Sequence, residues 1–126
     1  MTWDIAEAAK TYEFRKGGAD HQITYAELKC NQFVLAVIRE TVDPKFPETL
    51  ANDFVRSPKF MRTTEPKAGD LVHWPGHIGI VLNPDLGTFI GSQTSTGVAE
   101  ANYKNGWWSG DYGGKTPDYF LRWIGP

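Results

Sequence analysis

Weakly polar and apolar side chains follow a helical period in the first half of the chain. They recur at i, i+3, i+4, i+7, i+8 and i+11, the stripe of a helix that packs on a core: Cys30, Phe33, Val34, Val37, Ile38 and Thr41. Two further helices are predicted. One covers residues 4–12, which have helix-forming composition, and a short one covers roughly residues 49–56, between Pro47 and Pro58.

Two starting points are open for the helix that carries Cys30. Thr24-Tyr25-Ala26-Glu27 has the spacing of a capping box, which would begin the helix near Tyr25 and place Cys30 in its second turn. A later start would place Cys30 in the first turn. In both cases Cys30 lies on the buried stripe.

The pattern changes after Pro66, where short apolar runs replace the helical period. Gly, Pro, Asn and Asp separate these runs, which indicate antiparallel strands over residues 71–74, 78–82, 88–90, 98–101 and 119–124. The segment from Asn83 to Gly87 predicts a hairpin between two of them. Helices followed by strands are typical of an α+β fold, here with N-terminal helices packed on a small antiparallel sheet.

The composition fits one compact domain and excludes several classes of protein. A chain of 126 residues with a net charge of −2 has room for one core, and no run of Lys or Arg marks a nucleic-acid binder. The longest apolar stretch, residues 33–38, is far too short to cross a bilayer, so no membrane partner is expected. Asp4 and Glu7 stand where a signal peptide is apolar, so none is expected.

Cys30 and His77 are the residues best suited to covalent chemistry. Cys30 is the single cysteine, so it forms no internal disulfide and its thiol is available for packing or reaction. A helix start and a nearby imidazole both favour a thiolate. His77 begins a predicted strand whose end can meet the helix, so we expect the pKa of Cys30 to be lowered. Taken alone, each residue is more often part of a core.

A zinc site is the alternative interpretation of the two nearby histidines. His73 and His77 are four residues apart, but Trp74-Pro75-Gly76 between them predicts a turn rather than a helix, on which this spacing would put both on one face. We therefore expect no metal and no other cofactor. His73 is expected to be a partly exposed strand residue, and Lys59, Arg62 and Lys67 to form a solvated face.

Four sequence blocks occur in the order and spacing of a known family. They are Lys29-Cys30-Asn31-Gln32-Phe33-Val34, Gly69-Asp70-Leu71-Val72-His73-Trp74, His77-Ile78-Gly79-Ile80-Val81, and the stretch from Phe89 to Val98. Together they resemble the NlpC family of papain-like cell-wall cysteine peptidases and amidases, from about residue 24 to the end. The resemblance implies a papain-like cysteine hydrolase fold, with residues 1–126 forming a single NlpC-like catalytic domain.

The resemblance also assigns roles to individual residues. It implies that Cys30 is the nucleophile, that His77 is the general base, and that the backbone N–H groups of Cys30 and Asn31 bind the oxyanion. The family's third catalytic position, often a histidine, falls on Gly91, which has no side chain. Gln93 points to the same face of an extended strand and is expected to orient the imidazole.

Other site assignments stay open. Ser92 replaces Gln93 in this role if a bulge intervenes, and a simple Cys–His dyad is the third possibility. A tyrosine that assists the oxyanion in the family corresponds to Tyr25 or Tyr12. Lys29, Asn31 and Gln32 depart from the residues that the family commonly has beside the cysteine, which puts the substrate bond in doubt more than the nucleophile.

The expected function is hydrolysis of an amide bond in the peptidoglycan stem peptide by a monomer. The place of action is then the periplasm or cell wall, reached without a signal peptide, as an antibacterial effector with an immunity partner or as a phage-associated lysin. Two alternatives stay open. One is a cysteine amidase or deamidase acting on another amide, and the other is a glycan-binding module that uses Trp107, Trp108 and Tyr112.

Overall fold

The computed structural model describes residues 4–14, 22–104 and 116–126. In these residues the chain forms two α-helices, two 3₁₀-helices and six strands. They are α1 (Ile5–Thr11), η1 (Tyr12–Phe14), α2 (Cys30–Thr41), η2 (Ala51–Arg56), β1 (Phe60–Thr63), β2 (Leu71–Trp74), β3 (His77–Asn83), β4 (Thr88–Gln93), β5 (Gly97–Asn102) and β6 (Tyr119–Trp123).

The six strands form one antiparallel sheet in the order β1-β6-β2-β3-β4-β5. Strands β2 to β5 follow one another as hairpins, while β6 inserts between β1 and β2 at the other end of the sheet. Helices and strands are segregated along the chain and the sheet is antiparallel, which confirms the α+β class expected from the sequence.

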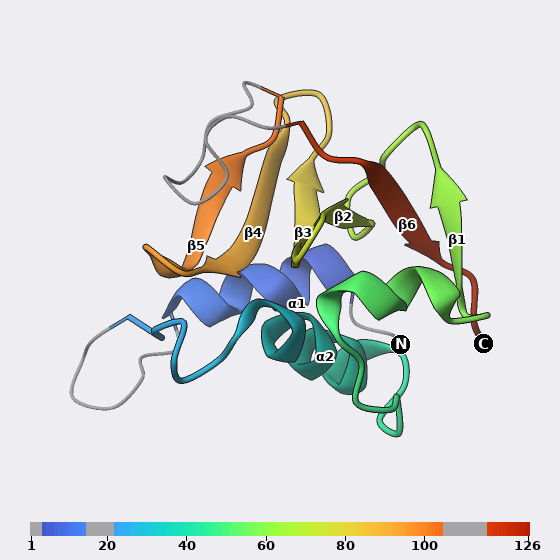
Figure 1. The fold of residues 1–126 in the computed structure, drawn as a ribbon, viewed down its shortest axis with the longest axis horizontal. Coiled ribbons are helices and arrows are strands. Elements are labelled where there is room, and N and C mark those ends of the chain that lie inside the picture. Colours follow the sequence, from blue (N-terminus) through green and yellow to red (C-terminus); the bar gives the residue numbers. More distant parts are fainter. Residues whose placement is uncertain (1–3, 15–21, 105–115) are drawn as a thin grey trace.

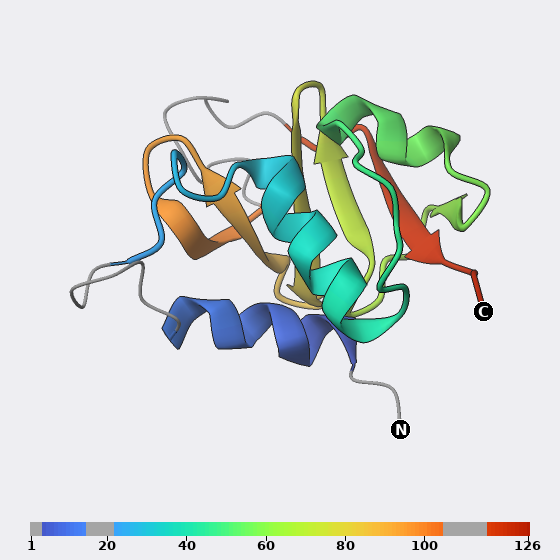
Figure 2. The same ribbon diagram turned by 90° about the horizontal axis from the view of Figure 1, so that it is seen from below.

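The helices lie on one face of the sheet (Figures 1 and 2). Helix α2 packs on β3 and β4, α1 packs on α2 and β3, and η2 lies against β1 and β3. Asp4 caps α1 by accepting the N–H of Ala6 at 2.8 Å. The apolar stripe of α2 packs in the main core with side chains from several strands: Leu71, Ile78, Ile80, Ile90 and Leu121.

The alternation along β3 decides which residues meet the helices. Ile78 and Ile80 belong to the core beneath α2, while Val81 packs in a second cluster with Val72, Trp74, Phe89 and Tyr103 on the opposite face. His77 has the same parity as Val81, and its ring lies 5.6 Å from that of Trp74. The imidazole therefore begins on the face of the sheet away from α2.

The structure adds three details to what the sequence predicts. Strand β1 was not expected, because its four residues are mostly exposed and carry little apolar signal, although it pairs along its whole length with β6. The short helix expected over roughly residues 49–56 is present as a 3₁₀-helix over Ala51–Arg56. Lys59 keeps 40% of its side chain exposed, but it also pairs with Asp43 and lies 5.9 Å from the centre of the Trp123 ring.

The loop before α2 is anchored on β4 and β5. The N–H of Val98 donates to Ile23 O at 2.9 Å, and the Ser92 hydroxyl donates to Leu28 O. Gly97 has a φ of 70°, and a Cβ there would lie 2.2 Å from Ile23 O, so only glycine allows this approach. These contacts fix the point at which the chain enters α2.

Candidate active site

Cys30 is the first residue of α2. The side chain of Gln32 accepts the N–H of Lys29, the N-cap residue, at 3.3 Å. The predicted capping box at Thr24 and Glu27 does form, but it closes an isolated turn ahead of the helix. The later of the two helix starts is therefore the correct one. Cys30 lies where unpaired backbone N–H groups and the helix dipole favour negative charge.

The Cys30 sulfur touches the backbone on both sides of His77. The thiol donates to Gly76 O at 4.0 Å, and the N–H of Ile78 lies near enough to stabilise a thiolate. The N–H groups of Asn31 and Cys30 act in the same way. The structure thus brings the helix start to the first residues of β3, as the sequence blocks implied.

Burial nevertheless raises the pKa of the Cys30 thiol above its usual value. The three backbone N–H groups and the side chain of Tyr25 lower the pKa, but their sum is smaller than the effect of desolvation. The lowered pKa expected from the sequence was therefore wrong for the free protein. Cys30 is a thiol at neutral pH, and its proton must leave when the sulfur reacts.

His77 is a neutral imidazole over most of the pH range. Its side chain is buried, and its pKa is lowered to about 4, mainly by this burial and to a smaller extent by the electrostatic interaction with His73, while a side-chain hydrogen bond with Gln93 acts in the opposite direction. Because the pKa lies far below the usual 6.5, His77 is neutral at pH 7, and one of its two ring nitrogens carries no proton. It is therefore able to accept one at neutral pH.

Gln93 occupies the space that a side chain at Gly91 would need. A Cβ at Gly91 would lie 2.6 Å from Gln93 Oε1. The amide Nε2 donates to Thr96 Oγ1 and Ala99 O, both at 3.3 Å, which directs Oε1 away from those acceptors. Oε1 reaches no donor at full hydrogen-bond geometry, yet Gln93 acts on the pKa of His77. The Gln93 and His77 side chains therefore lie close together.

The Ser92 side chain lies on the opposite face of the sheet from Gln93. Its hydroxyl is used by Leu28 O, on the side of the sheet that carries the helices, and β4 pairs with β5 in regular register from Thr88 to Gln93. The bulge that would have turned Ser92 toward the imidazole is therefore missing from this pairing. Gln93 is the residue of the two that meets His77.

Two other predicted residues have different outcomes. Tyr25 lies beside the Cys30 sulfur, as expected for a tyrosine near the oxyanion. Tyr12 is buried against Phe33 and donates to Glu40 at 2.7 Å, so it packs the helices instead. Trp107, Trp108 and Tyr112 lie outside the described residues. Within residues 4–14, 22–104 and 116–126, no group of three or more His, Cys, Asp or Glu side chains is placed to hold a metal.

Sequence reasoning missed the environment of His73. This residue is 3% exposed rather than partly exposed, and it shares a strand face with the core residue Leu71. Both its ring nitrogens have partners, Asp118 and Asn52, which come from distant parts of the chain. The parity with Leu71 was a usable signal for burial. The partners left no local signal, because each is an isolated polar residue outside the four sequence blocks.

The raised pKa of Cys30 gives a direct prediction for alkylation. We expect iodoacetamide to react slowly at neutral pH and faster as the pH rises, with an apparent pKa above the value of about 8.5 for an ordinary thiol. Mass spectrometry of the modified protein between pH 6 and 11 measures the rate. His77→Ala should leave the profile almost unchanged. An apparent pKa below 8.5 that rises on His77→Ala would instead reveal a thiolate–imidazolium pair.

No helix in the described part of the chain is long and apolar enough to cross a membrane. A scan against models of protein families finds no match to this chain, and a search of curated proteins finds none either.

Proposed function

We propose that this protein is a cysteine hydrolase that cleaves an amide bond in the peptidoglycan stem peptide, with a papain-like, NlpC-type arrangement of its α+β fold. Cys30 is the nucleophile and His77 the general base. One observation carries the proposal: the Cys30 sulfur lies at the N-terminus of α2, against the backbone on both sides of His77.

The first half of the reaction forms a thioester. For this step the imidazole, which rests on the face of the sheet away from α2, turns toward the sulfur at the start of β3. The Cys30 proton then moves from its contact with Gly76 O to the imidazole while the sulfur attacks the substrate carbonyl carbon. The C=O electron pair becomes an oxyanion. The imidazolium then protonates the leaving nitrogen, and the C–N bond breaks. Because the thiol and the imidazole are both neutral beforehand, proton transfer and attack belong to one step.

The second half returns the enzyme to its starting state. Water gives a proton to His77 and attacks the thioester carbonyl, and the C–S bond breaks as the thiolate takes the proton back. The N–H groups of Cys30 and Asn31 supply oxyanion donors in both halves, with Tyr25 beside them. Loss of one such donor typically costs about 3–4 kcal/mol of transition-state stabilisation.

The substrate class rests on the four sequence blocks, and the geometry is compatible with other amides. The same blocks support action in the periplasm or cell wall, as a delivered antibacterial effector or a phage-associated lysin. We also propose that the enzyme acts as a monomer and that, in the effector role, a partner blocks its site in the producing cell.

Digestion of purified sacculi tests the proposal. We expect the protein to release soluble fragments in which mass spectrometry finds one stem-peptide amide bond cut, with a new amine and a new carboxylate. Cys30→Ala is the matched control and should release none. Release of ammonia from glutamine side chains without peptide cleavage would establish a deamidase instead. Binding of sacculi by the parent and by Cys30→Ala, without turnover by either, would establish a binding module.

A further inference from the structure

A chain of hydrogen bonds from three segments ends at the turn before His77. Asp118 Oδ1 lies 2.7 Å from His73 Nδ1, and Asn52 Oδ1 lies 2.9 Å from His73 Nε2. The same Asn52 oxygen accepts the N–H of Gly76 at 2.7 Å. Asp118 precedes β6, His73 lies on β2 and Asn52 belongs to η2. This series of hydrogen bonds therefore connects three separate parts of the fold to one turn.

The Gly76 N–H determines which atom of the Asn52 amide takes part in these bonds. The backbone N–H of Gly76 is only a donor, which identifies the Asn52 atom that it meets as the oxygen. This oxygen also pairs with His73 Nε2, and the Asp118 carboxylate lies against Nδ1. Because both ring nitrogens are engaged in these contacts, neither is open to a substrate proton.

Gly76 connects this series of hydrogen bonds to the thiol of Cys30, the proposed nucleophile. Its N–H is held by Asn52, while its carbonyl oxygen is the hydrogen-bond partner of the Cys30 thiol. Gly76 has a φ of 82°, and the turn is only Pro75 and Gly76 between β2 and β3. The Asn52 side chain therefore anchors a turn that sets the position of His77 relative to the Cys30 sulfur.

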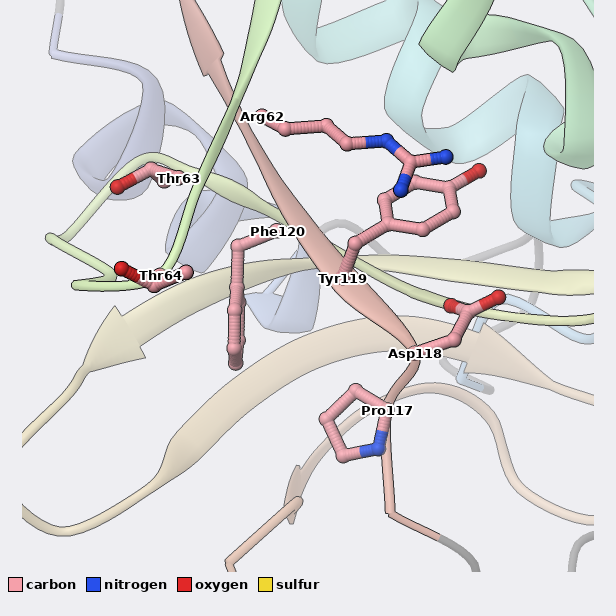
Figure 3. Close-up of a pocket in the computed structure, with 7 residues that line it drawn as sticks. All are labelled: Arg62, Thr63, Thr64, Pro117, Asp118, Tyr119 and Phe120. Carbon is pink, nitrogen blue, oxygen red and sulfur yellow. The ribbon is translucent and has the colours of Figure 1, made fainter.

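Asp118, the outer end of this series of hydrogen bonds, lies beside Tyr119 and near Arg62 (Figure 3). The Tyr119 ring stacks on His73, with 4.4 Å between the ring centres and 8° between the planes. The Arg62 guanidinium lies over the Tyr119 ring at 4.4 Å. Asp118 and Tyr119 line a hollow of about 600 Å³ that Cys30 and His77 do not reach. His73 is thus fixed by ring stacking and by both nitrogens.

We infer that Asp118, His73 and Asn52 are positioning residues that act through the Gly76 turn on Cys30 and His77. The inference rests on the proposed function for its effect on turnover. Its effect on the Cys30 thiol is independent of any substrate. Substitution of a residue with a merely structural role would lower the stability of the protein. It would not change the turnover or the Cys30 reactivity of the molecules that remain folded.

Asn52→Ala tests the inference, measured well below its thermal unfolding midpoint. We expect kcat for stem-peptide cleavage to fall about 10- to 100-fold with KM changed less than about threefold, because only the geometry of the reacting groups is lost. Iodoacetamide should modify Cys30 at least about threefold faster, since the released turn uncovers the thiol. Asn52→Asp keeps an acceptor oxygen and should restore both values to within about threefold of the parent.

Asn83→Ala is the matched control. Asn83 anchors the turn at the other end of β3 by accepting the N–H groups of Asp85 and Leu86, at 3.0 and 3.2 Å. This variant should leave kcat and alkylation unchanged. If Asn52→Ala does not fold, Asp118→Ala replaces it, because the Asp118 side chain is 40% exposed. We expect smaller changes in this variant, with kcat about 2- to 5-fold lower and alkylation about 1.5-fold faster than in the parent.

Three outcomes would overturn the inference: unchanged alkylation and kcat in folded Asn52→Ala, a defect in Asn52→Asp as large as that in Asn52→Ala, or the same changes in Asn83→Ala. Failure of the proposed function is distinguishable from all of these. If the parent protein cuts no amide while Asn52→Ala still alters Cys30 alkylation and Asn52→Asp restores it, the proposed reaction is wrong and the positioning of the thiol stands.

Discussion

Cys30→Ala and His77→Ala should each lower stem-peptide cleavage by at least about 1,000-fold, and the double variant should be little worse than either. The two side chains form one unit in which the sulfur needs the imidazole to remove its proton, because burial keeps the thiol protonated at neutral pH. Residues that act as a unit lose activity non-additively. Single-turnover rates on a defined stem peptide measure the effect.

The comparison requires that each variant be folded. Cys30 fills a buried position at the N-terminus of α2, so Cys30→Ser, which conserves its size, is the control for packing. His73→Asn is the control for a second buried histidine: it should slow the reaction through position only, well short of the loss in His77→Ala. Near-parental cleavage by Cys30→Ala would refute the cysteine mechanism. Additive losses in the double variant would refute the coupling of the two residues.

The elements that could be predicted from the sequence are those with a strong local pattern. The helical stripe through Phe33 and Ile38 and the apolar runs at residues 71–74 and 119–124 all became elements near the expected bounds. β1 escaped prediction because it is a short edge strand whose partner, β6, lies about sixty residues later in the chain. Pairing across such a separation leaves no trace in the local pattern of residues 60–63.

The candidate site also has features that could be predicted from the sequence and features that could not. Cys30 and His77 could be singled out because each begins an element, and their blocks resemble a family. Their pKa values could not be predicted, because desolvation depends on what covers a side chain in the folded protein. The role of Asn52 was also hidden. One side chain amide reaches a ring nitrogen and a backbone N–H from two other segments, and only the tertiary structure brings these together.

Gln93→Ala should lower kcat about 10- to 1,000-fold, because the imidazole then loses the amide that orients it. The same change should shift the acid limb of the kcat/KM profile to a lower pH. Gln93 raises the pKa of His77, so its removal leaves that pKa further below about 4, and His77 stays unprotonated to lower pH. A pH series of initial rates, restricted to the range in which the protein stays folded, measures both effects.

Substitution of Gly91 tests whether the position of the Gln93 amide matters for the reaction. Gly91→Ala should impair the reaction with Gln93 still present, because the new Cβ would lie 2.6 Å from Gln93 Oε1 and displace the amide. In the Gln93→Ala background this obstacle is gone, and the next atoms around a Cβ at position 91 are 3.4 Å away or more.

Gly91→His combined with Gln93→Ala should therefore recover part of the lost rate, with a ring nitrogen taking over the role of the amide oxygen. Ser92→Ala is the control from the neighbouring position, and it should stay close to the parent because Ser92 bonds Leu28 O on the other face. Full activity in Gln93→Ala together with a crippled Ser92→Ala would mean that the orienting residue lies on the helix side of β4. Parental rates in both would leave Cys30 and His77 working as a dyad, with the small space at Gly91 serving only to pack Gln93.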